Sequence, residues 1–227
     1  MTSPPRAILF DFDGTLATLH IDFEAMRREV RELVTRVAPD FVESQPRWTL
    51  ELIEAVTEQL NPHAAEFRAA AFQMIEQVEL RAASTSHWLP GAREALVELR
   101  QREIKLGVVT RNCRRAVVAI TGGTDWCEVL FTRDDVARVK PNPEHLLTAL
   151  RSLKVRPDEA LMVGDHAQDM VVARAAGLQG VGVLSGSSSR EALLEAGALA
   201  VLNSVAELPP WLTTSLCPSP PNCLPAS

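Results

Sequence analysis

The chain has 227 residues, 46% of them hydrophobic, so it is long enough to bury a large core. Its formal net charge of −6 argues against an electrostatic nucleic-acid binder, and with three lysines and no basic run nothing suggests attachment to anionic lipid. No apolar stretch approaches the roughly 20 residues that a membrane-spanning helix needs.

The first predicted element is a short buried strand, because residues 7–10 are four consecutive apolar residues. This strand runs directly into Asp11 and Asp13, which are followed by Gly-Thr. On its own, Asp-x-Asp-Gly fits an ordinary surface turn equally well. A calcium loop starting at Asp11 is excluded, because its sixth and twelfth positions should be Gly and Glu but are Leu16 and Asp22. In a parallel sheet, ligands bind beyond the carboxyl ends of the strands, which would place both carboxylates in a site.

The next segment, residues 19–87, predicts three helices and no strand. Asp22 can cap a first helix, whose apolar residues follow a 3.6-residue period until Pro39. Thr49 can cap a second helix, and the Asn-Pro pair at residues 61–62 can open a third. We therefore expect a helical insert of about a third of the chain, which is small enough to move as one body.

From residue 88 onwards, apolar strands and helices alternate, which is typical of a parallel sheet covered by helices on both faces. We expect strands at residues 104–109, 128–131, 160–163, 180–183 and 199–202, and helices at residues 92–102, 112–120, 142–153 and 191–196, with a further helix that ends near residue 176. The predicted fold class is α/β. A Rossmann-like parallel core would comprise residues 1–18 and 88–214, with an all-helical cap at residues 19–87 inserted after the first strand.

The C-terminal tail differs in composition, because six of the 15 prolines fall in the last 19 residues. Such a tail predicts neither a helix nor a paired strand beyond Leu208, and it predicts disorder over residues 215–227. A proline-motif ligand is the alternative to a plain frayed terminus, which we favour.

Two further polar residues fall at expected strand ends. The hydroxyl of Thr110, the backbone N–H of Arg111 and the start of the next helix would form an anion-binding corner. A simple helix cap explains Thr110 alone equally well. Lys140 lies in a Val-Lys-Pro-Asn-Pro segment, where two prolines would stiffen its loop. Most lysines are solvated surface residues, but a fixed cation is what a phosphoryl group needs.

A second acidic pair, Asp165 and Asp169, follows the apolar strand at residues 160–163 and spans one helical turn. Compensation of the helix dipole would explain one such aspartate, but it does not explain the pair in this setting. With Asp11 and Asp13, these residues would converge at one edge of the sheet. Two charges about 4 Å apart there repel by roughly 4 kcal/mol at an effective dielectric constant near 20. Because one lysine cannot neutralise four carboxylates and all the candidate ligands are oxygens, the sequence predicts Mg²⁺ rather than zinc.

The ordered set of these motifs resembles the haloacid dehalogenase superfamily, and most of all its phosphoglycolate phosphatase-like branch with a helical cap. The resemblance covers residues 6 to about 208 and rests on Asp11-x-Asp13-Gly14-Thr15, Thr110, Lys140-Pro141 and Gly164-Asp165-x-x-x-Asp169. The family often has Asp-Ser where this chain has Ala17-Thr18, and Thr-Asn where Arg111 intervenes here. Both departures bear on substrate choice rather than on phosphoryl chemistry.

The resemblance implies a two-step phosphoryl transfer. Asp11 would attack phosphorus to form an aspartyl phosphate, and Asp13 would protonate the leaving alkoxide and then deprotonate the attacking water. Thr110, Arg111 and Lys140 would bind the phosphoryl oxygens. The helical insert would close over the site and exclude water.

The resemblance also implies the metal ligands and the class of function. Mg²⁺ would be held by the carboxylates of Asp11 and Asp165 and by the backbone carbonyl of Asp13, and Asp169 would act through water or by orienting the others. The implied function is a Mg²⁺-dependent phosphatase for a small phosphorylated metabolite, with no nucleic-acid or membrane partner. Four cysteines without close pairing or zinc-finger spacing, and an N-terminus without a secretory signal, predict a cytoplasmic protein.

Several alternatives stay open at this point. A sugar-phosphate mutase uses nearly the same motifs, and a non-catalytic phosphate-binding or regulatory protein could share the fold. Asp13 argues against a dehalogenase, and the lack of lysine in residues 19–87 argues against phosphonate cleavage of the Schiff-base type. A receiver-type phosphoacceptor domain is about half this length and has no helical insert. Phosphoglycolate, a sugar phosphate and a nucleotide are all compatible substrates, and no oligomeric state is predicted.

A few residues are candidates for substrate contact without a defined role. They are His20, His166, Arg47 and Trp48, although exposed polar residues are the simpler interpretation of the two histidines. Cys113 is expected to be a small core residue. Residues 133–135, Arg-Asp-Asp, are expected to form a solvated loop.

Overall fold

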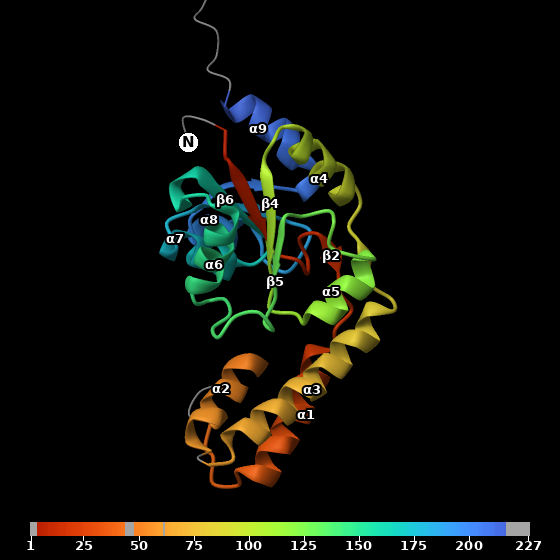
Figure 1. Cartoon of the computed structure of the whole chain (residues 1–227), viewed down its shortest axis with the longest axis vertical. Coiled ribbons are helices and arrows are strands. Elements are labelled where there is room, and N and C mark those ends of the chain that lie inside the picture. Colours follow the sequence, from red (N-terminus) through yellow and green to blue (C-terminus); the bar gives the residue numbers. More distant parts are fainter. Residues whose placement is uncertain (1–3, 44–47, 61, 217–227) are drawn as a thin grey trace, which may run out of the picture. The chain divides into compact units, whose positions relative to one another are not determined.

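The computed structural model of the chain describes residues 4–43, 48–60 and 62–216 (Figure 1). The chain divides into two compact units. The first contains the residues up to Thr18, residues 88–111 and the chain from residue 123 onwards, and the second contains residues 19–87 and 112–122. In the described part of the chain, no helix combines the length and the apolar character needed to cross a membrane.

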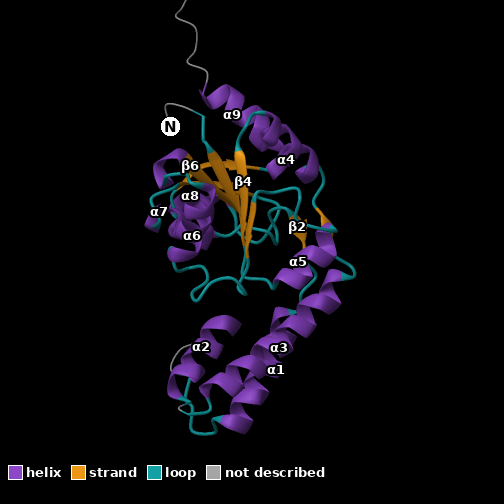
Figure 2. Cartoon of the chain, viewed as in Figure 1, coloured by secondary structure: helices purple, strands orange, loops and turns teal. Residues whose placement is uncertain are grey.

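The first unit is built on a six-stranded sheet in the order β5-β4-β1-β6-β7-β8, in which all neighbouring strands are parallel. Figure 2 shows the strands in orange with helices around them in purple. The strands of this sheet are β1 (Ala7–Phe10), β4 (Lys105–Val109), β5 (Val129–Phe131), β6 (Ala160–Gly164), β7 (Gln179–Val183) and β8 (Ala198–Leu202). The chain fills the sheet in one direction from β1 to β5 and in the other from β6 to β8. The carboxyl ends of β1 and β6 therefore form the switch point at which doubly wound sheets bind ligands.

Helices lie on both sides of this sheet, so the predicted α/β fold class is confirmed (Figure 1). The helices are α4 (Ala92–Gln101) and α9 (Leu208–Leu216) on one side, and α6 (Glu144–Leu153), α7 (Ala167–Ala175) and α8 (Arg190–Glu195) on the other. In α6, the buried residues Leu146, Ala149, Leu150 and Leu153 recur at intervals of three or four residues. One apolar face of the helix can therefore pack into the core beneath the sheet.

β1 lies at the centre of the first unit, and all of its residues are 0% exposed. A strand with neighbours on both edges and helices on both faces has no solvent-facing side, which explains its uninterrupted apolar sequence. Burying one side chain such as Phe10 contributes roughly 2 to 3 kcal/mol. The register pairs Phe10 with Val108 of β4 and with Val163 of β6. The three strands therefore end at the same level, and the residues that follow them are brought together.

The described residues of the second unit form the helices α1 (Phe23–Val37), α2 (Thr49–Gln59), α3 (Ala64–Ala83) and α5 (Arg114–Thr121). Although α5 follows β4 in the chain, it packs on α3. The carboxylate of the buried Glu79 on α3 accepts a hydrogen bond from the Cys113 backbone N–H at 2.9 Å. Arg115 of α5 pairs with Glu76 of α3 at 2.9 Å. These two contacts explain why α5 groups with the helical insert.

The helix starts in this unit agree only partly with the prediction. The cap of α1 is present, since the Ala25 N–H donates to Oδ1 of Asp22 at 2.8 Å. The predicted starts of the other two helices are wrong, because Thr49 is the first residue of α2 rather than its cap, and α3 begins at Ala64 rather than at Pro62. Residue 61 lies outside the described residues.

Two short strands, β2 (Ala17–Thr18) and β3 (His87–Trp88), form a separate two-stranded sheet where the chain leaves and re-enters the first unit. The prediction of no strand between residues 19 and 87 is therefore wrong at His87. Strands of two residues are too short to show an alternating pattern in the sequence.

The C-terminal prediction is also partly wrong, because α9 forms a helix over residues expected to be irregular. Pro209 and Pro210 occupy its first turn, where a missing backbone N–H costs no intrahelical hydrogen bond. Residues 215–216, which were predicted to be disordered, belong to this helix. The rest of the predicted disordered tail lies outside the described residues.

Candidate active site

Three carboxylates from two distant parts of the sequence meet beyond the ends of β1 and β6. Asp11, Asp165 and Asp169 each place an oxygen within 4.8 Å of the other two. The Asp11 backbone N–H donates to the carbonyl of Val163 at 2.9 Å, which carries the pairing of β1 with β6 past the end of β1. Gly164 leaves the space that this approach needs, because a Cβ at that position would lie 2.4 Å from Oδ2 of Asp169.

Asp13 lies in the tight turn that follows β1, and its carboxylate is not part of this group of three. The turn is closed by a hydrogen bond of 2.8 Å from the Gly14 N–H to the carbonyl of Ala17. Gly14 has a φ of +73°, a backbone conformation that favours glycine. Of the four aspartates expected to converge, Asp13 is thus placed beside the group, half-buried and not clustered with the others.

Lys140 is the cation of this site. Its Nζ atom lies 2.8 Å from Oδ1 of Asp11 and 2.7 Å from Oδ1 of Asp169. Burial disfavours the charged ammonium, but the two carboxylates outweigh this effect and raise the pKa of Lys140 above its ordinary value. The lysine backbone N–H donates to Nδ1 of His145 at 3.2 Å. Burial and the neighbouring Lys140 charge lower the pKa of His145 to about 4, so its imidazole is neutral at pH 7.

Both oxygens of Asp165 accept hydrogen bonds from the protein. The Thr15 hydroxyl donates to Oδ1 at 3.2 Å, and Ser187 donates to Oδ2 from its N–H at 2.8 Å and from its hydroxyl at 3.1 Å. Burial and the nearby Asp11 charge raise the pKa of Asp165, while Ser187 opposes that shift. The carboxylate is therefore held in a defined orientation.

Asp169 lies in the first turn of α7. Its Oδ1 atom accepts from Lys140, and its Oδ2 atom accepts from the His166 backbone N–H at 3.3 Å. Burial raises the pKa of Asp169 to about 7, with Lys140 offsetting part of the shift and Asp11 adding to it. His166 is the helix cap, because its Nδ1 atom accepts from the Gln168 N–H at 3.1 Å.

Thr110 is buried at the end of β4, where its N–H donates to the carbonyl of Phe131 at 3.0 Å. The helix expected to start at residue 112 begins at Arg114. Its cap is Cys113, whose Sγ atom accepts from the Ala116 N–H at 3.4 Å. The helix therefore starts two residues later than predicted, and Thr110 follows Val109, the last residue of β4.

The carbonyl of Arg111 accepts a hydrogen bond of 3.1 Å from Nη1 of Arg133. Arg133 is 6% exposed, so the expected solvated loop is wrong at this residue. Asp135 is exposed, but its Oδ2 atom accepts from the N–H and the hydroxyl of Thr132 at 2.8 and 2.6 Å. The loop after β5 thus binds its own polar groups and supports the backbone of Arg111.

The remaining candidate contacts lie in the second unit or outside the described residues. His20 is exposed in the second unit, where its ring centroid lies 6.1 Å from that of His87. Trp48 is 58% exposed. Arg47 lies outside the described residues.

The sequence assigned no role to Thr15, Ser187 or His145, which hold the acidic residues and the lysine in place. A signal for Ser187 was present, because a Ser-Gly-Ser-Ser-Ser run starts at residue 185 and follows β7 at the same edge of the sheet. His145 had no comparable signal, since a histidine on the apolar face of α6 looks like an ordinary core residue.

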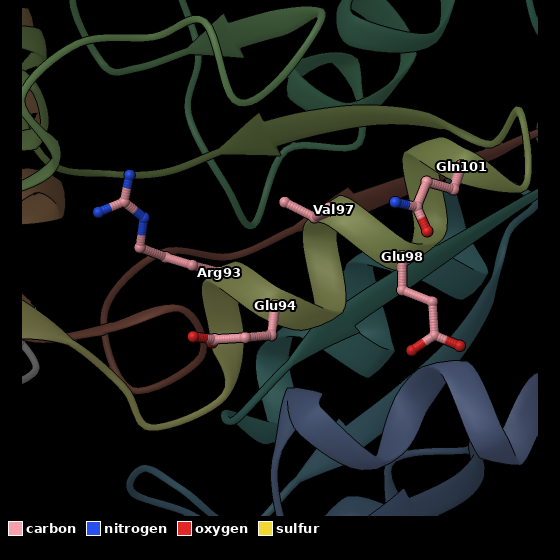
Figure 3. Close-up of a pocket in the computed structure, with 5 residues that line it drawn as sticks. All are labelled: Arg93, Glu94, Val97, Glu98 and Gln101. Atoms are coloured by element: carbon pink, nitrogen blue, oxygen red, sulfur yellow. The ribbon is translucent and has the colours of Figure 1, made fainter.

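A second surface feature is distinct from this site. A recess of about 520 Å³ lies along α4, and Figure 3 shows the residues that line it. These are Arg93, Glu94, Val97, Glu98 and Gln101, none of which belongs to the acidic group. All five residues lie on one helix and their charges are mixed, so they do not form a set of polar groups directed at a common ligand.

The donor set of the acidic group fits a hard cation. Its carboxylates supply only oxygen, which is the ligand that Mg²⁺ and Ca²⁺ prefer. If all three carboxylates are ionised, they and one ammonium carry a net charge of −2 in a largely buried space. A bound divalent cation would balance that charge.

Comparison with known proteins agrees with these observations. The profile of a family described as haloacid dehalogenase-like hydrolase matches residues 8–183. The chain is 32% identical over 224 residues to a plasmid-encoded phosphoglycolate phosphatase of Cupriavidus necator, covering 92% of this chain and 94% of that protein. It is also 32% identical over 203 residues to validoxylamine A 7′-phosphate phosphatase of Streptomyces hygroscopicus subsp. limoneus, with coverage of 86% and 92%. Among solved structures, a hydrolase from Pseudomonas syringae has a TM-score of 0.68 at 24% identity over 93% of this chain and 99% of that chain, which supports the fold.

Proposed function

Because this chain belongs to the haloacid dehalogenase-like hydrolase family, we propose that it is a Mg²⁺-dependent phosphatase acting on a small phosphorylated metabolite through an aspartyl phosphate. Its relatives named as phosphatases support a phosphoric monoester hydrolase. The identity of the metal, the nucleophile and the covalent intermediate are further parts of this proposal. The observation that carries them is the contact of Lys140 with Asp11 beside Asp165, at the switch point of the sheet.

In the first step, a carboxylate oxygen of Asp11 attacks phosphorus, and the bond from phosphorus to the leaving oxygen breaks. Asp13 donates a proton to that oxygen, so the product leaves as an alcohol. In the second step, water gives a proton to Asp13 and attacks phosphorus, which releases phosphate and the Asp11 carboxylate. A proton carrier must keep its carboxyl free of metal. The placement of Asp13 outside the group of three carboxylates supports this role.

Mg²⁺ would be held by the carboxylates of Asp11 and Asp165 and by the backbone carbonyl of Asp13. When bound, the ion would reduce the repulsion between the nucleophile and the anionic phosphoryl group. Asp169 would orient the ammonium of Lys140, because Lys140 contacts Asp169 as well as Asp11.

Thr110, Arg111 and Lys140 would bind the phosphoryl oxygens. Thr110 follows the last residue of β4 and lies about one residue beyond the level of Asp11, because the register pairs Phe10 with Val108. A fixed ammonium, a hydroxyl and a backbone N–H aimed at the same oxygens would stabilise the charge of the transition state.

The alcohol that leaves in the first step differs among the relatives of this chain. The relatives named above for phosphoglycolate and for validoxylamine 7′-phosphate share a phosphate ester but differ in the alcohol, so we extend only the phosphoryl chemistry to this chain. We propose that residues 19–87 act as the cap that selects the alcohol, and that the protein works in the cytoplasm.

Hydrolysis of p-nitrophenyl phosphate in the presence of Mg²⁺ tests the function directly. The parent chain should release nitrophenolate and phosphate, and Asp11→Asn should release neither. Asp40→Asn is the matched control, because Asp40 is an exposed aspartate in the second unit. A panel of phosphorylated metabolites compared by kcat/KM would then identify the alcohol. Isomerisation of a sugar phosphate without free phosphate would contradict a phosphatase and indicate a mutase.

A further inference from the structure

A serine-rich loop after β7 contacts both acidic turns of the site. Ser187 donates two hydrogen bonds to Oδ2 of Asp165, at 2.8 and 3.1 Å. The Ser188 N–H donates to the Asp165 backbone carbonyl at 3.3 Å. The Ser185 hydroxyl donates to the carbonyl of Gly14 at 2.7 Å. The loop therefore links the turn after β1 with the turn after β6.

The Asp165 carboxylate is also tightly enclosed by backbone atoms of neighbouring loops. A Cβ at position 186 would lie 2.0 Å from Oδ2, and a Cβ at position 14 would lie 2.7 Å from the same atom, so both positions need glycine. The Thr15 hydroxyl donates to the other oxygen at 3.2 Å. Asp165 is thus confined between two glycine backbones, with a hydroxyl donor at each carboxylate oxygen.

We propose that Ser187 and Thr15 are positioning residues, whose hydroxyls hold the Asp165 carboxylate in the orientation that binds the divalent cation. This inference rests on the proposed Mg²⁺-dependent function. Hydrogen bonds to a ligating carboxylate fix its direction before the metal arrives, and losing such a partner commonly weakens metal affinity by roughly 10- to 100-fold. Ser187 is the stronger of the two, because it donates from both its backbone and its side chain.

A purely structural role for the loop predicts a different pattern of contacts. Ser189 shows that pattern, since its hydroxyl accepts from the Ala192 N–H at 3.2 Å and caps α8. The hydroxyls of Ser187 and Thr15 instead point to a carboxylate that faces two other carboxylates. Of these three hydroxyl groups, therefore, only those of Ser187 and Thr15 should affect metal affinity.

Titration calorimetry with MgCl₂ on the substrate-free protein tests the inference without using activity. Ser187→Ala should raise the Mg²⁺ dissociation constant by about 10-fold. Ser187→Thr keeps a hydroxyl and should restore most of the affinity, while Ser189→Ala should leave the affinity unchanged. Thr15→Ala should also weaken binding, and this variant decides the question if far-UV circular dichroism shows that Ser187→Ala does not fold.

The outcomes separate this inference from the proposed function. Parental Mg²⁺ affinity in both alanine variants, together with lost binding in Asp165→Asn, would overturn the positioning role and leave the phosphatase intact. Weakened binding in a protein that hydrolyses no phosphate ester would support the positioning role and overturn the phosphatase. A parent chain that binds no Mg²⁺ would overturn both.

Discussion

The ammonium of Lys140 lies 2.7 Å from Oδ1 of Asp169, while the same Nζ atom lies 2.8 Å from Oδ1 of Asp11. All three side chains are at least partly withdrawn from solvent, and the lysine is held from both sides. Lys140 therefore couples the proposed nucleophile to the first turn of α7. A flexible surface lysine could not hold a phosphoryl group in a fixed place.

Lys140→Met is expected to destabilise the metal-free protein by about 3 to 5 kcal/mol, because it leaves buried carboxylates without their cation. Urea unfolding in EDTA, followed by circular dichroism, measures this loss. Lys105→Met is the matched control, since Lys105 donates to the Leu153 carbonyl at 2.7 Å and should cost only about 1 kcal/mol. Equal losses in the two variants would contradict the importance of the ion pairs.

Asp13→Asn should slow the first step by about 10²- to 10⁴-fold for an alkyl phosphate, because the alkoxide then leaves without its proton. The loss should be smaller for p-nitrophenyl phosphate, whose nitrophenolate is a good leaving group without protonation. Single-turnover measurements of product release on both substrates check this. The role of Asp13 as an acid is contradicted if the two substrates lose the same factor.

His145 should make the protein more sensitive to acid. Its folded pKa of about 4 lies below the ordinary value of 6.5, so in that range the unfolded chain binds a proton that the folded chain does not. The free energy of unfolding therefore contains a contribution from His145 that is fully present above pH 6.5. This contribution, about 3 kcal/mol in total, is lost as the pH falls towards 4.

His145→Gln removes this titration. The difference in unfolding free energy between the parent and the variant should therefore shrink by about 3 kcal/mol from near pH 7 to near pH 4. Urea unfolding at the two pH values measures the change, and His63→Gln, at an exposed histidine, serves as the control. Parallel pH curves for the parent and His145→Gln would show that the buried imidazole does not titrate as inferred.

Gly186→Ala should displace the Asp165 carboxylate, because the new Cβ would lie 2.0 Å from its Oδ2 atom. At 100 times its dissociation constant, Mg²⁺ should stabilise the parent by about 2.7 kcal/mol, and Gly186→Ala should lose most of that gain. Thermal unfolding with and without MgCl₂ measures it.

Gly122→Ala is the control for backbone strain. Its φ is +76° but no atom lies within 4 Å of the added Cβ, so it should cost about 1 kcal/mol and keep the stabilisation by Mg²⁺. If Gly186→Ala also kept that stabilisation, Asp165 would not be a ligand.

The sheet was predictable because its interior strands are uninterrupted apolar runs. Residues 7–10 and 160–163 have no solvent-facing side, and such runs are recognisable without any tertiary information. The acidic residues were found for a related reason, since each pair begins directly after such a run. Parallel strands must place those residues at one edge.

The failures have different physical origins. β2 and β3 are too short to carry a period, and α9 tolerates its prolines because they lie in its first turn, where they lose no hydrogen bond. The burial of Arg133 depends on a carbonyl contributed by a different loop. In that case the surroundings, rather than the local sequence, decided the structure.

By itself, the sequence determined the α/β class and which charged residues follow the strands, because residue type and apolar run length are local properties. Only the tertiary structure decided that Lys140 pairs with Asp169, that the Asp13 carboxylate stands outside the group of three, and that Asp165 is held by hydroxyl groups. Those contacts join segments 22 to 150 residues apart in the chain. They depend on strand register and loop conformation, which no local pattern encodes.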